Sequence, residues 1–92
     1  MSFKKRSPLP AQSRSLLELA NGEHGVLERL DLPADVARRL MELGFLPGAR
    51  VTAARSAPGG DPRVFRVDGV DIALRRETAA HLKLRAGLDP HA

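Results

Sequence analysis

The sequence has 92 residues, of which 42% are hydrophobic and 28% are charged, so it has room for one small domain of ordinary soluble composition. It contains no cysteine, which excludes disulfide bridges, thiol nucleophiles and zinc sites built on thiolates. No apolar run approaches the ~20 residues of a membrane-spanning helix, and the basic N-terminus lacks the apolar stretch of a secretory signal. We therefore expect a cytoplasmic protein.

The formal net charge of +4 makes nucleic acid or an anionic membrane a first candidate partner. A Lys-Lys-Arg run at residues 4–6 supplies much of this charge, in a segment with prolines and no apolar periodicity. Residues 1–14 are therefore predicted to be a disordered basic tail, and without this cluster the remaining charge is close to neutral. One folded domain is predicted over residues 15–85, followed by a tail over residues 86–92.

The folded part is predicted to begin with a short turn. The sequence SLLE matches a capping box, in which Ser15 caps the turn and Glu18 reaches back to it. This turn would carry Leu16 and Leu19 inward. Residues 25–30 are then predicted to form the first strand.

A helix is predicted after Pro33, because proline suits the first turn of a helix. Its apolar residues recur at helical spacing and form one stripe, made of Val36, Ala37, Leu40 and Leu43. Asp35 and Arg39 are four residues apart and are expected to form an ion pair on the solvated face. Gly44 is expected to end the helix with a positive φ angle.

A second strand is predicted over residues 51–56, with Val51 and Ala53 on one face. The sequence PGGDP at residues 58–62 predicts a loop. Asp68-Gly69 is then a two-residue hairpin turn of the preferred type. The register that places the apolar residues on one face pairs Val67 with Val70, Phe65 with Ile72, and Arg66 with Asp71.

The chain is predicted to end with one helical turn over residues 77–81 and a short strand over residues 81–84. The element order therefore gives five short strands with one inserted helix. Closure of such a sheet removes its exposed edges, so the predicted fold class is mainly β, a small and partly open five-stranded barrel. Any edge that stays exposed leaves self-association into a homo-oligomer open.

The sequence offers little for chemistry. It has no glycine-rich phosphate loop and no evident Ser-His-acid arrangement, so we predict that the protein is not an enzyme. Glu77 and His81 are four residues apart and would need a third ligand such as His24 to hold a divalent metal ion. The favoured interpretation is that these three side chains are ordinary surface residues in contact with solvent. We therefore assign no metal site and expect no required cofactor.

Single-stranded nucleic acid is the main alternative ligand, because small barrels bind it on aromatic platforms in a basic groove. The chain has three phenylalanines and no tyrosine or tryptophan. Phe3 falls in the predicted tail and Phe65 in the predicted core, which leaves Phe45 as the candidate platform. This shortage of aromatic residues favours a protein partner over nucleic acid.

The segment MELGFLPGARV is the best candidate for protein binding. Phe45 follows the helix-ending glycine, where an apolar residue usually folds back onto the last turn, here onto Leu40. A structural role is therefore favoured over a partner contact for Phe45. Leu46 has no expected packing partner. It is either a contact residue for a partner or an ordinary exposed apolar residue, and the sequence does not distinguish these two interpretations.

Three segments in this order resemble the FeoA family: RRLMELGFLPGARV, APGGDP, and ALRRETA after the hairpin. The resemblance covers residues 16–84 and implies an SH3-like barrel. It also implies a cytosolic accessory protein of bacterial ferrous iron transport, with the GTP-binding cytosolic region of the permease FeoB as partner and an indirect membrane association through it. The same barrel occurs in iron-dependent repressors, but we expect no room here for DNA-reading helices.

The resemblance transfers no catalytic or metal residues. The matching positions form the candidate partner-binding set: Leu43, Gly44, Leu46, Pro47 and Gly48, with Arg75 and Arg76 after the hairpin, and Phe45 beside them. For Arg75 and Arg76, simple solvent exposure at the end of a strand is as well supported as a contact with a partner.

Overall fold

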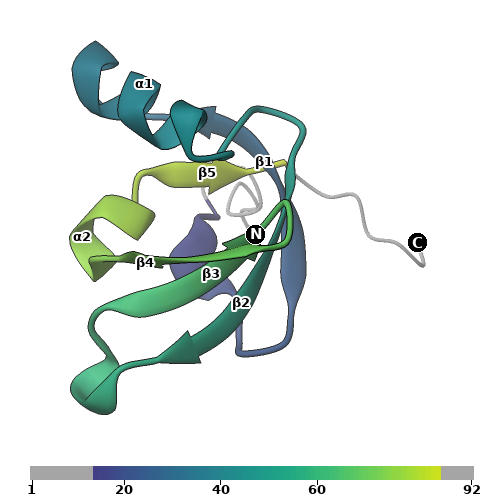
Figure 1. Ribbon diagram of the computed structural model, residues 1–92, viewed down its shortest axis with the longest axis vertical. Coiled ribbons are helices and arrows are strands. Elements are labelled where there is room, and N and C mark those ends of the chain that lie inside the picture. Colours follow the sequence, from purple (N-terminus) through teal and green to yellow (C-terminus); the bar gives the residue numbers. More distant parts are fainter. Residues whose placement is uncertain (1–13, 86–92) are drawn as a thin grey trace, which may run out of the picture.

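The computed structural model describes residues 14–85 (Figure 1). The predictions for the tails therefore lie outside the described residues, except at Arg14. The elements in chain order are η3 (Leu16–Glu18), β1 (His24–Leu30), α1 (Ala34–Glu42), β2 (Arg50–Ser56), η4 (Pro58–Gly60), β3 (Arg63–Val67), β4 (Val70–Leu74), α2 (Arg76–Ala79) and β5 (Leu82–Leu84).

The five strands form one antiparallel sheet in the order β4-β3-β2-β1-β5. The sheet curls so that β4 and β5, its two edge strands, lie on the same side of the molecule, and α2 connects them (Figure 1). Helix α1 lies beside one end of this open barrel. The predicted mainly β fold with one inserted helix is therefore confirmed.

The hairpin between β3 and β4 has the predicted register at all three residue pairs. Asp68 and Gly69 have φ angles of 54° and 79°, as a two-residue turn of this hand requires. Phe65 and Val67 point into the barrel and are buried. Val70 was expected on the same apolar face, but it is 53% exposed because it sits at the turn, where the barrel ends.

Three finer predictions for the helical segments are wrong. The stripe of α1 is buried only at Ala37 and Leu40, because the helix contacts the barrel along a narrow line. The expected ion pair between Asp35 and Arg39 is not among the three salt bridges of the described residues. Glu18 closes its turn through its backbone N–H, which donates to the Ser15 carbonyl at 2.9 Å, and in the described residues its side chain makes no hydrogen bond back to Ser15.

Ser15 nevertheless caps the first turn, because its Oγ accepts a hydrogen bond from the Leu17 N–H at 3.2 Å. Leu16 and Leu19 point inward and are buried, as predicted. The strands predicted over residues 25–30, 51–56 and 81–84 agree with β1, β2 and β5 within one residue at each end.

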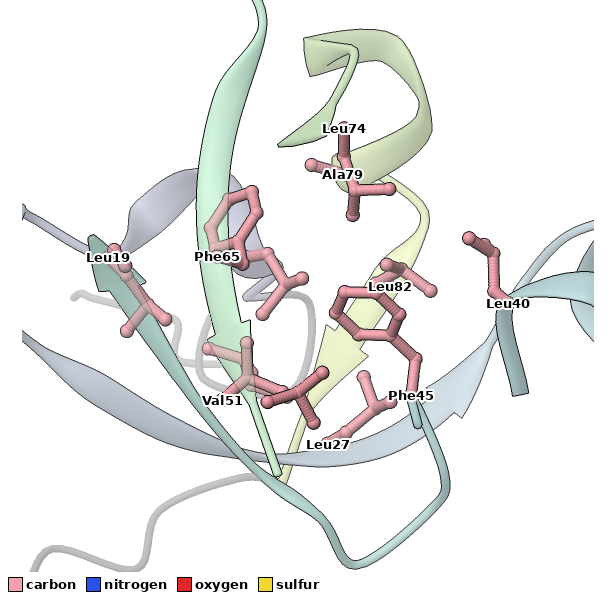
Figure 2. Close-up of a cluster of buried hydrophobic side chains, with 13 residues drawn as sticks. Leu19, Leu27, Leu40, Phe45, Val51, Phe65, Leu74, Ala79 and Leu82 are labelled. Atoms are coloured by element: carbon pink, nitrogen blue, oxygen red, sulfur yellow. The ribbon is translucent and has the colours of Figure 1, made fainter. Parts of the chain in front are cut away.

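The interior of the barrel is apolar and closely packed (Figure 2). Its largest fully buried side chains come from six different parts of the chain: Phe45, Phe65, Leu16, Leu27, Leu82, Val51 and Val67. Burial of each such side chain contributes about 1.5–3 kcal/mol to folding. Because no disulfide is available, the stability of the domain depends on this cluster.

Arg63 is a buried cation that sequence reasoning did not single out. It is 6% exposed, and its guanidinium donates hydrogen bonds to the Leu17 carbonyl at 3.3 Å and to the Asn21 side chain at 3.0 Å. It also lies 5.3 Å from the centre of the Phe65 ring. Arg63 therefore ties the first turn to β3.

Candidate protein-binding surface

The segment from Leu43 to Gly48 begins with a Schellman motif that ends α1. The Phe45 N–H donates to the Leu40 carbonyl at 3.1 Å, and the Gly44 N–H donates to the Met41 carbonyl at 3.0 Å. Gly44 has a φ angle of 117°, which L-residues rarely adopt. The predicted end of the helix is therefore confirmed, and the motif fixes the directions of the residues around Gly44.

Phe45 and Leu46 point in opposite directions from this junction. Phe45 has no exposed surface and packs in the core near Leu82 and Leu40 (Figure 2). The predicted structural role of Phe45 is thus confirmed, and its side chain is not available for direct contact with a partner. Leu43 and Leu46 are both 48% exposed, which is high for large aliphatic side chains on ordered backbone.

Leu46 lies on a turn with little freedom to move. The Ala49 N–H donates to the Leu46 carbonyl at 2.8 Å and closes a turn that contains Pro47 and Gly48. Two more backbone hydrogen bonds, from Gly48 to Leu27 and from Leu27 to Ala49, anchor this turn to β1. These bonds hold the backbone of the exposed Leu46 in one position.

The junction lies against the tip of the β3–β4 hairpin. A side chain added at Gly44 would place its Cβ 3.4 Å from the Val67 side chain. The two segments enclose an open hollow of about 440 Å³, lined by Gly44, Leu46, Ala49, Arg50, Val67 and Asp68. We use the name junction surface for this hollow together with Leu43, Pro47, Gly48 and Val70.

Sequence reasoning found only the Leu43–Gly48 half of the junction surface. Val67 and Asp68 join it through tertiary structure, and no local pattern places them beside Gly44. The position of Val70 weakly indicated that its side chain would be exposed. It directly follows the two-residue turn, so it lies at the end of its strand, where the barrel covers less of it.

A charged cluster lies on the outer face of the sheet next to this surface. Asp71 on β4 accepts hydrogen bonds from Arg66 at 2.7 Å and from Arg55 at 3.2 Å. The hydrogen bonds from Arg66 and then Arg55 lower the pKa of Asp71, and the carboxylate in turn raises the pKa of Arg66. All three side chains are exposed, so the cluster orients charges and adds little stability.

Arg75 and Arg76 lie apart from the junction surface. They follow the far end of β4, a strand whose five residues span roughly 17 Å. Arg75 precedes the first turn of α2, and the Arg76 N–H donates to the Asp61 carboxylate at 2.9 Å. Both side chains are exposed. The structure therefore does not bring these arginines together with Leu46.

The candidate metal ligands do not form a cluster. His24, Glu77 and His81 are all exposed, and no three His, Cys, Asp or Glu side chains in residues 14–85 gather closely enough to hold a metal ion. The predicted turn over residues 77–81 is shorter than expected, because α2 ends at Ala79.

The aromatic platform required for single-stranded nucleic acid is not at the surface in this part of the chain. Phe45 and Phe65 are fully buried, and Phe3 lies outside the described residues. Within the described residues, no helix is both long and apolar enough to cross a lipid bilayer.

A small antiparallel barrel with a helix inserted between β1 and β2 defines the class of protein, an SH3-like domain. The FeoA domain model matches residues 14–86, which is most of the chain. The chain therefore belongs to the FeoA domain family.

One relative combines this domain with a transporter. The Fe(2+) transport protein A/Fe(2+) transporter FeoB fusion protein of Porphyromonas gingivalis is 33% identical over 69 residues. The match covers 75% of this chain and only 8% of the fusion protein, so the chain corresponds to a small part of that relative.

Two solved structures have the same fold. The FeoA protein of Chlorobium tepidum matches with a TM-score of 0.73 and 32% identity, over 85% of this chain and 76% of that one. FeoA of Stenotrophomonas maltophilia, complexed with zinc and described as an SH3 domain protein, matches with a TM-score of 0.68 and 34% identity, over 78% and 89% of the two chains. The predicted family and barrel type are thus confirmed.

Proposed function

We propose that this protein is a cytoplasmic accessory protein of ferrous iron uptake that binds the cytosolic GTP-binding region of a FeoB-type permease. The fusion relative supports the proposal, because it carries an Fe(2+) transport protein A region and FeoB in one chain. Covalent joining is expected for regions that act together, because a linker raises the effective concentration of one region for the other. The membrane association of this chain would then be indirect, through the permease.

We assign the contact to the junction surface. The observation that carries this assignment is Leu46, a large apolar side chain that is half exposed on a turn anchored by backbone hydrogen bonds. A rigid apolar residue at the rim of a hollow loses little conformational entropy on binding and can fill a pocket on the partner. Arg50 and Asp68 in the hollow supply one charge of each sign for orientation.

The proposed role is that of a binding module without catalysis of its own. Most of the barrel interior is filled by aliphatic and aromatic side chains, so its ionisable groups lie mainly on the exposed faces. No metal or other cofactor is part of the proposed function. Residues 15–85 are proposed to be sufficient for binding, because they include the complete barrel and the junction surface.

The test measures the affinity of the full chain for the purified cytosolic domain of the cognate permease. Leu46→Ala should weaken binding by about tenfold or more, and Leu46→Glu should weaken it further, because a charge would be buried at the contact. Val36→Ala is the matched control, since Val36 is also exposed on α1 but lies two helical turns from Leu43.

Melting temperatures decide whether each variant is folded. Both Leu46 variants should melt within a few degrees of the parent, since substitutions at exposed positions change stability little. Unchanged affinity in folded Leu46 variants would remove the junction surface from the proposal. Absence of binding by the parent chain would remove the proposed partner.

A further inference from the structure

The two edges of the sheet differ in whether another segment of the chain pairs with them. The outer edge of β5 is covered, because the Leu84 N–H donates to the Arg14 carbonyl at 2.9 Å and Ser15 forms a β-bridge with Lys83. The outer edge of β4 has no such cover among residues 14–85. Within the described part of the chain, no backbone hydrogen bond outside the sheet ladder involves residues 70–74, and of the described elements β3 alone packs extensively along β4.

The hairpin register shows which peptide groups of β4 face outward. Val67 and Val70 flank the two-residue turn and form a hydrogen-bonded pair. Hydrogen-bonded and non-hydrogen-bonded pairs alternate along an antiparallel ladder, and this ladder has no bulge between Val70 and Leu74. The N–H and C=O groups of Asp71 and Ala73 therefore point away from β3, toward the open edge.

β4 lacks the devices that normally protect an exposed edge. It contains no proline, no lysine and no bulge. Its one charged residue is Asp71, whose carboxylate is held on the outer face by Arg66 and Arg55 and so is already neutralised. Nothing on this strand opposes the approach of a second strand.

We propose that β4 pairs with β4 of a second copy of this chain, antiparallel and centred on Ile72. This register places Asp71 of each copy opposite Ala73 of the other. Both residues present their N–H and C=O groups outward, so the two pairs would exchange four backbone hydrogen bonds. A one-residue slip would oppose outward-facing groups to inward-facing ones. A two-residue slip would keep only one of the two hydrogen-bonded pairs, so the register centred on Ile72 is favoured.

The side chains agree with this pairing. On the inner face, Ile72 would lie opposite its own copy, and the exposed Val70 would lie opposite Leu74 of the second copy. On the outer face, the two Asp71 residues would be diagonal neighbours with their Cα atoms roughly 7–8 Å apart, and each carboxylate keeps its own arginine partners.

The expected dimer is weak. A single pair of five-residue strands buries less than the ~1,200 Å² of stable interfaces, so the dimer should form only at high protein concentration. The dimer does not depend on the proposed permease, because its test needs only the purified chain.

The test is amide hydrogen exchange of the full chain, measured by NMR at about 20 µM and about 2 mM protein. The amides of Asp71 and Ala73 should exchange roughly three- to tenfold more slowly at the higher concentration. The amide of Gly59, an exposed residue of η4 that is not part of β4, is the internal control and should not change. Equal exchange of Asp71 and Ala73 at both concentrations would overturn the proposal, whether they are fast or protected throughout.

A proline variant gives an independent test. Ala73→Pro removes an outward-facing N–H that the monomer does not use, and proline is tolerated at such edge positions. It should abolish the concentration dependence at Asp71, whereas Ala73→Ser, which keeps the N–H, should retain it. If Ala73→Pro fails to fold, the exchange experiment on the parent still decides. Dimerisation that survives in a folded Ala73→Pro variant would overturn the pairing through β4.

Discussion

The interior of the barrel and the junction surface contain similar apolar residues but use them differently. Phe45 belongs to the interior and has no contact with solvent, whereas Leu46, the next residue, is half exposed. The Schellman motif at Gly44 produces this difference, because it turns the backbone so that one side chain folds onto Leu40 and the next points outward. Neighbours in the sequence thus have separate positions, one in the core and one on the proposed binding surface.

This comparison shows why local hydrophobicity is a poor guide to function. Both residues are large and apolar, and the same short motif contains both. What separates them is whether a tertiary partner is available: Phe45 has the barrel interior beside it, and Leu46 has the open hollow. An apolar residue held rigidly away from the interior is a stronger indication of binding than an exposed apolar residue on a mobile loop.

The largest expected effect sharpens the contrast between Phe45 and Leu46. Phe45→Ala should lower the free energy of unfolding by about 3–5 kcal/mol, because it leaves a cavity in a small core. Leu46→Ala should change it by no more than about 0.5 kcal/mol. Urea unfolding followed by circular dichroism measures both values.

A small domain has a total stability of only about 5–15 kcal/mol, so Phe45→Ala removes a large part of it and is expected to populate the unfolded state. Phe45→Leu is the milder variant and should cost about 1–2 kcal/mol. Equal losses of unfolding free energy in Phe45→Ala and Leu46→Ala would contradict the distinction between a core residue and a surface residue.

The sequence predicted the hairpin better than any other region. Asp68-Gly69 and the alternation around it determine the register locally, so the three cross-strand pairs follow from the pattern alone. The end of α1 was also predictable, since Gly44 and the apolar residue after it match a known capping motif.

The candidate site was predicted only where it is local in sequence. Leu46 could be singled out because it lies between a capping motif and a Pro-Gly turn. The contact between Gly44 and Val67 could not, because it depends on how a helix end meets a distant hairpin. The same reason explains why the prediction was wrong for Val36 and Leu43, which are exposed. Periodicity shows which face of a helix is apolar, but it does not show how much of that face the barrel covers.

A smaller effect is expected from the two glycines at the ends of the Gly44–Gly48 segment. Gly44→Ala should cost about 1–2 kcal/mol, because its φ angle of 117° strains an L-residue, whereas the new methyl group would lie at an ordinary van der Waals distance of 3.4 Å from Val67. Gly48 has a φ angle of 94° and open space around it, so Gly48→Ala should also cost about 1–2 kcal/mol through backbone strain.

The two glycine variants should therefore lose similar amounts of stability, because backbone strain accounts for both losses. Chemical denaturation of both variants under the same conditions measures the two losses. A loss at Gly44→Ala that exceeds the loss at Gly48→Ala by more than about 1 kcal/mol would mean that the new methyl group clashes with Val67.

The smallest expected effect concerns the charged cluster beside the junction surface. The hydrogen bonds from Arg66 and Arg55 lower the pKa of Asp71 in the folded state, so the folded protein favours the ionised carboxylate. This contribution is present above the ordinary aspartate pKa of about 3.9 and is lost as the pH falls through the lower pKa of the folded state.

Asp71→Asn should therefore lower the melting temperature slightly at neutral pH, and the difference from the parent should vanish in acid. Glu28→Gln, at an exposed carboxylate on β1 outside the salt bridges of the described residues, is the control. A difference between Asp71→Asn and the parent that stays constant from neutral pH to below the folded-state pKa would mean that the pairing of charges does not stabilise the hairpin.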